Sequence, residues 1–279
     1  MIKAPRLREK CAAQLNLFYL ALSFFTRLPV PKNMLYSSEL LSQSNRYFSL
    51  VGLLLGIVIA SSFYIFSFVF PIFVNILLIM MISLLLTGAF HEDGLTDMAD
   101  GIGGAFKPEQ RLAIMKDSRI GTYGAVTLII TLALKFCLLL SLAQHSVISL
   151  IAALVLGFSL SRTLAASLIS ALPYVGDENN SKSNSVVQSQ TRQDILILIL
   201  FGAMPLFLFS LTISLSIILT LFLFRVLFVR WLMAKIGGYT GDCLGAAQQI
   251  SELLIYLVLV FFLNDFEAMQ RANSGGILF

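Results

Sequence analysis

Charged residues are scarce in this chain of 279 residues: Asp, Glu, Lys and Arg make up 12% of it, whereas hydrophobic residues make up 58%. A soluble domain of this length carries about 25% charged residues. The mean hydropathy is +0.88. Several apolar runs approach the roughly 20 residues that are needed to cross a bilayer. The scarcity of charge therefore excludes an ordinary soluble domain and predicts a membrane protein.

Other features are also missing. The three cysteines, Cys11, Cys137 and Cys243, lie too far apart to indicate a disulfide framework or a zinc site. The alternating pattern of a transmembrane β-barrel is absent, and no internal repeat stands out. The first residues lack the small-residue cleavage site of a signal peptide. The net charge of +4 suits anionic head groups or anionic substrates and does not distinguish between them.

The apolar runs predict an all-α fold, a polytopic integral membrane helical bundle that forms one membrane-embedded catalytic domain over residues 1–279. About seven transmembrane helices are expected. Their predicted ranges are 50–70, 72–90, 122–142, 147–172, 195–210, 211–232 and 244–263. Pro205 interrupts the fifth of these, and a polar loop rich in Asn and Ser follows Pro173.

The basic residues orient this topology. They gather in the segments 27–46, 91–120 and 225–242, whereas the alternate connections contain no Lys or Arg. Because cytoplasmic loops carry the excess of basic residues, we expect these three segments to face the cytoplasm from the cell inner membrane. The helix expected at 12–26 follows several basic residues that should also be cytoplasmic. We therefore predict that it is interfacial or re-entrant and does not cross the membrane.

An acidic segment, GAFHEDGLTDMADGIGG, directly follows the second apolar run. Asp93, Asp97 and Asp100 are spaced at i, i+4 and i+7, which places them within about 60° of one another on a helix, with Glu92 beside them. Such carboxylates repel one another, and a hard divalent cation such as Mg²⁺ would neutralise them. The alternative is a solvated helix end, but acids beside a membrane span are usually functional. His91 is a candidate metal ligand, general base or hydrogen-bonded structural residue.

A second constellation, IMKDSRIGTYGA, opens the third predicted span. Lys116 and Arg119 are suited to clamping phosphates, and free N–H groups near Gly121 and Thr122 at the helix start favour anions. Asp117 is a candidate metal ligand or proton acceptor. The alternative is a basic interfacial anchor with a Gly-rich cap, which explains the basic residues but not the interleaved Asp.

A third constellation, GGYTGDCLGAAQQISE, opens the last predicted span. Asp242 is either a helix cap or a further ligand or base on the same face. Gln248, Gln249 and Glu252 follow in an otherwise apolar helix, where polar groups more often line a cavity than contact lipid.

Two further basic residues lie inside predicted spans. Lys135 is long enough to snorkel towards the membrane surface. Arg162 is flanked by serines and should face the bundle interior, where its partner is either a phosphate or an acid.

Six segments of the chain resemble the cobalamin synthase family, adenosylcobinamide-GDP ribazoletransferase. They are FFTRLPVP (24–31), RYFSLVGLLLG (46–56), GAFHEDGLTDMADGIGG (88–104), MKDSRIGTYGA (115–125), SRTLAASLISALPY (161–174) and GGYTGDCLGA (237–246). The resemblance covers nearly the whole chain. It implies an integral membrane enzyme of the last steps of vitamin B12 assembly. The implied substrates are adenosylcobinamide-GDP and α-ribazole or its 5′-phosphate, the implied cofactor is Mg²⁺, and GMP is released.

The resemblance suggests roles for the candidate residues in phosphoryl transfer, which needs positioning and charge neutralisation. The expected metal ligands are Glu92, Asp93, Asp97 and Asp100. The expected substrate-binding residues are His91, Lys116, Arg119, Gly121, Thr122 and Arg162. Asp117 or Asp242 is expected to accept the proton of the attacking ribose hydroxyl.

Two other classes of function remain open. One is another Mg²⁺-dependent membrane phosphotransferase or prenyltransferase that acts on a diphosphate, although the D-G-x-x-A-R pattern of CDP-alcohol phosphotransferases is not matched after Asp93. The other is a transporter, whose sites would lie near the bilayer midplane at broken helices and not at span ends. The lipid bilayer is an expected partner and nucleic acid is not. A homo-oligomer stays open.

Overall fold

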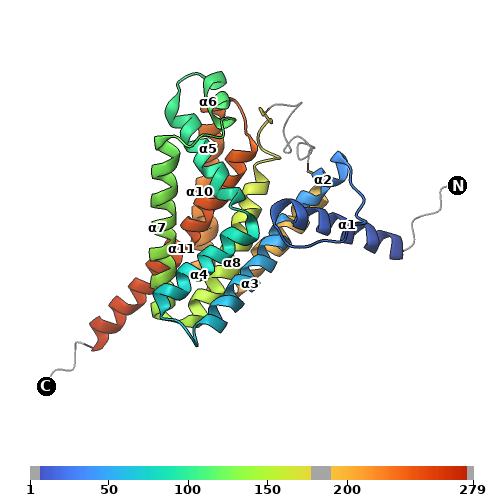
Figure 1. Cartoon of the computed structure of the whole chain (residues 1–279). Coiled ribbons are helices and arrows are strands. Elements are labelled where there is room, and N and C mark those ends of the chain that lie inside the picture. The colour runs from blue at the N-terminus through green and yellow to red at the C-terminus, as the bar shows by residue number, and fades with distance from the viewer. Residues whose placement is uncertain (1–6, 177–189, 275–279) are drawn as a thin grey trace.

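The computed structural model describes residues 7–176 and 190–274, and in these ranges the chain is helical, apart from turns and one isolated bridge between Tyr174 and Tyr239. The elements in chain order are α1 (Leu7–Phe25), α2 (Ser38–Ser44), η1 (Asn45–Tyr47), α3 (Phe48–Phe66), α4 (Ile72–Thr87), α5 (Phe90–Gly104), α6 (Pro108–Met115), α7 (Thr122–His145), α8 (Val147–Ser167), α9 (Arg192–Ala203), η3 (Met204–Leu208), α10 (Leu211–Ile236) and α11 (Gly241–Ser274). Most of them form one elongated bundle, and the N-terminal part of α1 projects away from it (Figure 1). The all-α membrane fold is confirmed.

Among the described residues, five helices are long and apolar enough to cross a membrane, and the bent pair of α4 and α5 makes a sixth if it counts as one span. The five are Ser38–Phe66, Thr122–His145, Val147–Ser167, Leu211–Ile236 and Gly241–Leu263. The sequence predicted seven. The difference arises in the ranges 72–90 and 195–210, where the helices are shorter than the apolar runs.

The predicted span at 195–210 is broken near Pro205. α9 has 12 residues and is followed by η3, a 3₁₀ helix that contains this proline. Proline lacks the N–H group and clashes with the preceding turn, so a regular α-helix does not continue through it. α9 nevertheless packs along α8, where Thr163 Oγ1 donates a hydrogen bond to the carbonyl oxygen of Leu198 at 3.4 Å.

The predicted helix at 12–26 is present as α1, whose apolar part is too short for a span. It packs against α2 and α3. Whether it lies in the membrane interface stays a prediction. Most of the polar loop expected after Pro173 lies outside the described residues.

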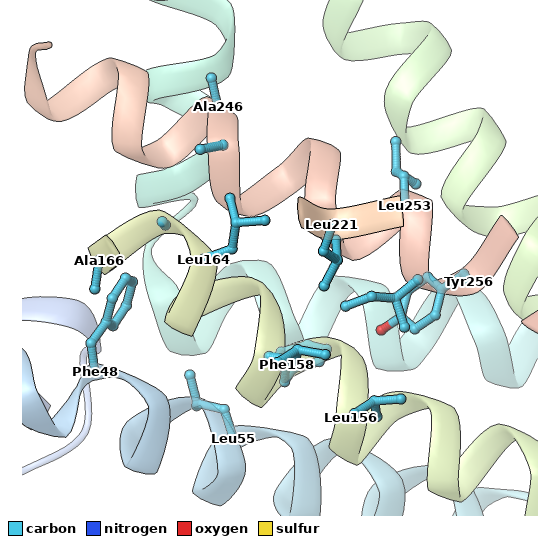
Figure 2. Close-up of a cluster of buried hydrophobic side chains, with 14 of the residues drawn as sticks. Phe48, Leu55, Leu156, Phe158, Leu164, Ala166, Leu221, Ala246, Leu253 and Tyr256 are labelled. Carbon is cyan, nitrogen blue, oxygen red and sulfur yellow. The ribbon is translucent and has the colours of Figure 1, made fainter. Parts of the chain in front are cut away.

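The centre of the bundle is the contact between α3 and α8, where glycines bring the two backbones close together. A Cβ atom at Gly56 would lie 2.9 Å from the Cα of Val155, and one at Gly52 would collide with the carbonyl oxygen of Phe158. Small residues allow such close packing in membranes, where dispersion contacts drive helix association. Phe48, Leu55, Phe158 and further apolar residues of α8 and α11 fill the space around this contact (Figure 2).

The segments that carry the sequence motifs meet at one end of the bundle. Arg111 Nη1 of α6 donates a hydrogen bond to the carbonyl oxygen of Lys235 in α10 at 2.8 Å. The N–H of Tyr239, just before α11, donates to the carbonyl oxygen of Pro173 at 2.9 Å. At the opposite end, Leu142, Ile148 and Ser210 line one cavity, so two of the connections without Lys or Arg, near residues 144 and 210, lie together there. These connections are therefore separated from the motif segments, while the expectation that the motif end faces the cytoplasm stays a prediction.

Candidate active site

The acidic helix α5 begins at a sharp turn. α4 and α5 are bent by 86° relative to each other, and the two residues between them, Gly88 and Ala89, both have left-handed backbone angles, with φ of 66° and 56°. Glycine adopts this conformation at little cost, whereas alanine is strained in it. The guanidinium of Arg27 lies against Gly88, so closely that a Cβ atom there would collide with it. The turn directs α5 towards α11 and the motif end of the bundle.

α5 meets the start of α11 through two glycines. A Cβ atom at Gly94 would lie 2.9 Å from the Cα of Asp242, and one at Gly245 would lie 3.1 Å from the carbonyl oxygen of His91. Because the backbones approach this closely, Asp242 joins the acids of α5 although it is far from them in the sequence. The sequence left open whether Asp242 is a helix cap or a further ligand or base on the same face.

Three carboxylates converge beside this contact. Asp93 is exposed, while Asp97 and Asp242 are half-buried. The charges of Asp93, Asp242 and Asp100 all act on Asp97. Within residues 7–176 and 190–274, no Lys or Arg forms an ion pair with Asp93, Asp97 or Asp242. We call these three residues the acidic cluster.

The donor chemistry of the acidic cluster fits a hard divalent cation, since such ions take oxygen ligands. In the part of the chain that the structure describes, however, no group of three or more His, Cys, Asp or Glu side chains is arranged to hold a metal ion. Mg²⁺ usually keeps several waters and binds through one or two carboxylates together with substrate phosphates. A complete cage of protein ligands is therefore not needed, and the residues present fit Mg²⁺ bound jointly with a phosphate.

Asp100 lies on the same helix but serves a different contact. Its two carboxylate oxygens accept hydrogen bonds from the N–H groups of Gly121 at 2.7 Å and Gly124 at 2.8 Å. Both of its oxygens thereby cap the start of α7. The N–H of Gly121, which was expected to bind substrate, is taken by this bond, while the neighbouring Thr122 is exposed.

Glu92 points away from the acidic cluster into the bundle. It is 5% exposed and accepts a hydrogen bond from Gln249 Nε2 of α11 at 2.9 Å. Its other oxygen, Oε2, has no hydrogen-bond partner among the described residues. The structure thus divides the four predicted metal ligands: Asp93 and Asp97 lie in the acidic cluster, whereas Asp100 and Glu92 do not.

Asp117 and Arg119 form an exposed ion pair in the connection between α6 and α7. Arg119 Nε lies 3.0 Å from both carboxylate oxygens of Asp117. The guanidinium lowers the pKa of Asp117, which makes this carboxylate a weaker proton acceptor than an unpaired one. Lys116 is exposed beside this pair. Asp242, which no cation neutralises within the described residues, is the better candidate base.

Arg162 lies in the core of the bundle, 1% exposed and far from solvent. Its Nη1 donates to the carbonyl oxygen of Phe158 at 2.8 Å, and its charge interacts with those of Glu252 and Glu92. Of the two partners that the sequence left open, the structure therefore shows acids around Arg162.

Lys135 is also buried, so it does not snorkel to the membrane surface. Its Nζ lies 2.7 Å from Glu252 Oε1, with both side chains almost fully buried. Gln248 Nε2 and the hydroxyl of Tyr256 donate to the same carboxylate at 2.7 and 3.0 Å. The polar residues of α11 were expected to line a cavity, but Gln248 and Glu252 take part in these buried contacts. Sequence spacing alone does not show that α7 presents Lys135 to α11.

His91 is buried between aromatic rings. It is 2% exposed and stacks on Phe48 with 5.8 Å between ring centroids. Its Nε2 atom has no hydrogen-bond partner among the described residues. His91 therefore lies next to the acidic cluster in the sequence but faces an aromatic cavity.

Comparison with known proteins identifies relatives over almost the full chain. Residues 17–260 match the family model described as cobalamin-5-phosphate synthase. A protein of Vibrio parahaemolyticus named adenosylcobinamide-GDP ribazoletransferase is 53% identical over 253 residues, 90% of this chain and 94% of its own length. Proteins of the same name from Vibrio cholerae and Shewanella amazonensis are 50% and 51% identical over 90% and 88% of this chain, and over 95% of their own lengths. No solved structure matches the chain.

Proposed function

The chain belongs to the cobalamin-5-phosphate synthase family, and we propose that its acidic cluster is the centre at which this family's reaction takes place. The protein is an adenosylcobinamide-GDP ribazoletransferase: it transfers the adenosylcobinamide phosphate group to α-ribazole or its 5′-phosphate and releases GMP, in the final steps of cobalamin synthesis. The observation that supports this location is the meeting of Asp93 and Asp97 with Asp242 at the contact of α5 and α11.

The reaction takes place at the diphosphate of adenosylcobinamide-GDP. A ribose hydroxyl of the acceptor forms a new bond to the cobinamide-side phosphorus, and the bond from that phosphorus to the oxygen of GMP breaks. Asp242 takes the hydroxyl proton, and the hydroxyl of Thr240, which donates to its Oδ2 at 3.1 Å, orients it. Lys116 and Arg119 bind phosphate oxygens from the exposed connection before α7.

Asp93 and Asp97 are the residues that would hold Mg²⁺, which would supply charge neutralisation for the diphosphate and the departing GMP. Asp100 holds the start of α7 and with it the connection that carries Lys116 and Arg119. This assignment removes Asp100 and Glu92 from the predicted ligand set and keeps Asp242 as the base.

The protein is a multi-pass membrane protein. We place it in the cell inner membrane with the acidic cluster facing the cytoplasm. The support for this orientation is the positive-inside rule, because the connections at the motif end carry the basic residues. The expected lipid contact follows from the many exposed apolar side chains of α7 and α10.

The reaction can be measured on purified full-length protein in detergent. Given adenosylcobinamide-GDP, α-ribazole and Mg²⁺, it should release GMP, detected by chromatography. EDTA should stop the release and added Mg²⁺ should restore it. Release of GMP that continues in EDTA would refute the metal assignment, and absence of GMP from a folded, Mg²⁺-supplied sample would refute the function.

A further inference from the structure

A small aromatic cavity lies beside the contact between α5 and α11. Its volume is about 40 Å³, and its walls include Phe24 and Phe25 of α1, Phe48 of α3, and Phe90 and His91 of α5. Gly241, the neighbour of Asp242, also lines it. The cavity therefore borders the acidic cluster, because Gly241 and Asp242 are adjacent residues at the start of α11.

The rings around the cavity form an ordered stack. Phe25 and Phe48 are stacked at 3.7 Å with 18° between their planes, and Phe48 and His91 follow at 5.8 Å with 16°. Phe90 meets Phe25 and His91 edge-on, at 6.3 and 5.5 Å. Offset stacking and edge-to-face contact are the arrangements that aromatic rings favour, so a flat ring system entering here would extend an existing pattern.

One buried polar atom in this wall has no partner. His91 Nε2 has no hydrogen bond among the described residues, although the side chain is 2% exposed. Buried polar atoms almost always have a partner, so such an atom calls for a ligand or a water. A neutral imidazole offers a single donor or acceptor at Nε2. The cavity thus suits a flat, mostly apolar ligand with a single hydrogen-bonding ring nitrogen.

We infer that this cavity binds the aromatic base of the ribazole acceptor, an inference that rests on the proposed function. The base, a dimethylbenzimidazole joined to ribose through one ring nitrogen, keeps a single free ring nitrogen, which matches His91 Nε2. Guanine, the other base in the reaction, carries several donors and acceptors that the mainly aromatic wall would leave unpaired. With the base in the cavity, the attached ribose reaches Gly241 and the carboxylate of Asp242.

The base is larger than the cavity, so side chains must move when it binds. Phe24 is partly exposed and Phe90 is 41% exposed. These two rings contact each other at 5.6 Å and are the more exposed part of the wall, so we expect them to turn outward when the base enters.

Filling the cavity tests the inference. Leu244→Trp places a large side chain at a partly buried lining position, whereas Leu257→Trp makes the same change on the same helix at a position that is 41% exposed. We expect Leu244→Trp to raise the KM for α-ribazole by about tenfold and to leave the KM for adenosylcobinamide-GDP within about twofold of the parental value. Leu257→Trp should change neither. Equal changes in both KM values, or no change in either, would overturn the inference.

A second variant separates ligand contact from a structural effect. His91→Phe keeps a ring in the stack but removes the hydrogen bond of Nε2. We expect it to weaken binding of dimethylbenzimidazole riboside by about tenfold, measured by calorimetry, and to leave binding of phenyl riboside, which lacks a ring nitrogen, unchanged. Equal weakening of both ribosides would overturn the inference. Because this measurement needs no turnover, it decides the inference even if the protein releases no GMP.

Discussion

The acids of α5 and α11 belong to two sets of charged side chains, and these sets are built in opposite ways. In the acidic cluster, Asp93, Asp97 and Asp242 face one another without a cation among the described residues. In the core, a set that we call the ionic network combines Glu92 and Glu252 with two cations, Lys135 and Arg162. The charges of the ionic network neutralise one another, whereas the charge of the acidic cluster is neutralised only when a cation binds from outside.

The difference follows from solvent access. An unbalanced charge inside a membrane bundle is costly, so the buried acids are paired and hydrogen-bonded. The acidic cluster lies at the motif end of the bundle, where Asp93 is exposed, so a cation can reach its carboxylates from solvent. Position along the same two helices therefore separates a structural set of charges from a functional one.

The largest expected effect comes from removing one charge of the acidic cluster. Asp97→Asn should lower kcat by about a thousandfold, because a ligand that stabilises transition-state charge is lost. The melting temperature in detergent should not fall, since Asp97 forms no ion pair with a described residue. GMP release and thermal unfolding measure the two quantities. Parental turnover in this variant would show that Asp97 is not a ligand.

The reverse pattern is expected in the ionic network. Glu252→Gln should lower the free energy of unfolding by about 3 kcal/mol, because two buried cations lose their counter-charge. Thermal unfolding in detergent checks this. Adding Lys135→Met, which removes one of the stranded charges, should recover much of the loss. A double variant less stable than Glu252→Gln alone would contradict the role given to this pair.

A variant of Asp100 tests whether this acid has a structural role, although it lies on α5 like Asp93 and Asp97. If its carboxylate caps α7, Asp100→Asn should cost about 1 kcal/mol of stability, as for other lost caps, and should lower kcat by less than about tenfold. The same assays of GMP release and unfolding apply. A loss of turnover as large as that of Asp97→Asn would return Asp100 to the ligand set that its spacing first suggested.

The smallest effect is expected at the exposed ion pair of Asp117 and Arg119. Arg119→Gln should raise the KM for adenosylcobinamide-GDP about fivefold, through one lost phosphate contact, and should leave the melting temperature unchanged because the Arg119 side chain is 87% exposed. Initial rates at varied substrate concentration measure this. An unchanged KM would remove Arg119 from the binding surface.

The sequence by itself determined the class of the fold and the motif end of the bundle. Apolar runs of bilayer length can be recognised in the sequence alone, because the thickness of the bilayer sets their length. A continuous apolar run of this length forms a helix, since a helix satisfies all of its backbone hydrogen bonds within the segment. The helical spacing of Asp93 and Asp97 likewise places them on one face before any packing is known. The sequence predicted too many spans, in part because Pro205 shortens α9.

Only the tertiary structure decided which acids act together. Asp97 and Asp100 share a helical face, yet Asp100 binds Gly121 and Gly124 while Asp97 meets Asp242. Lys135 and Glu252 are far apart in the sequence and are joined because α7 and α11 pack side by side. The physical reason is that a spacing rule fixes directions around one helix axis, whereas the partner of each side chain depends on which other helix the bundle places there.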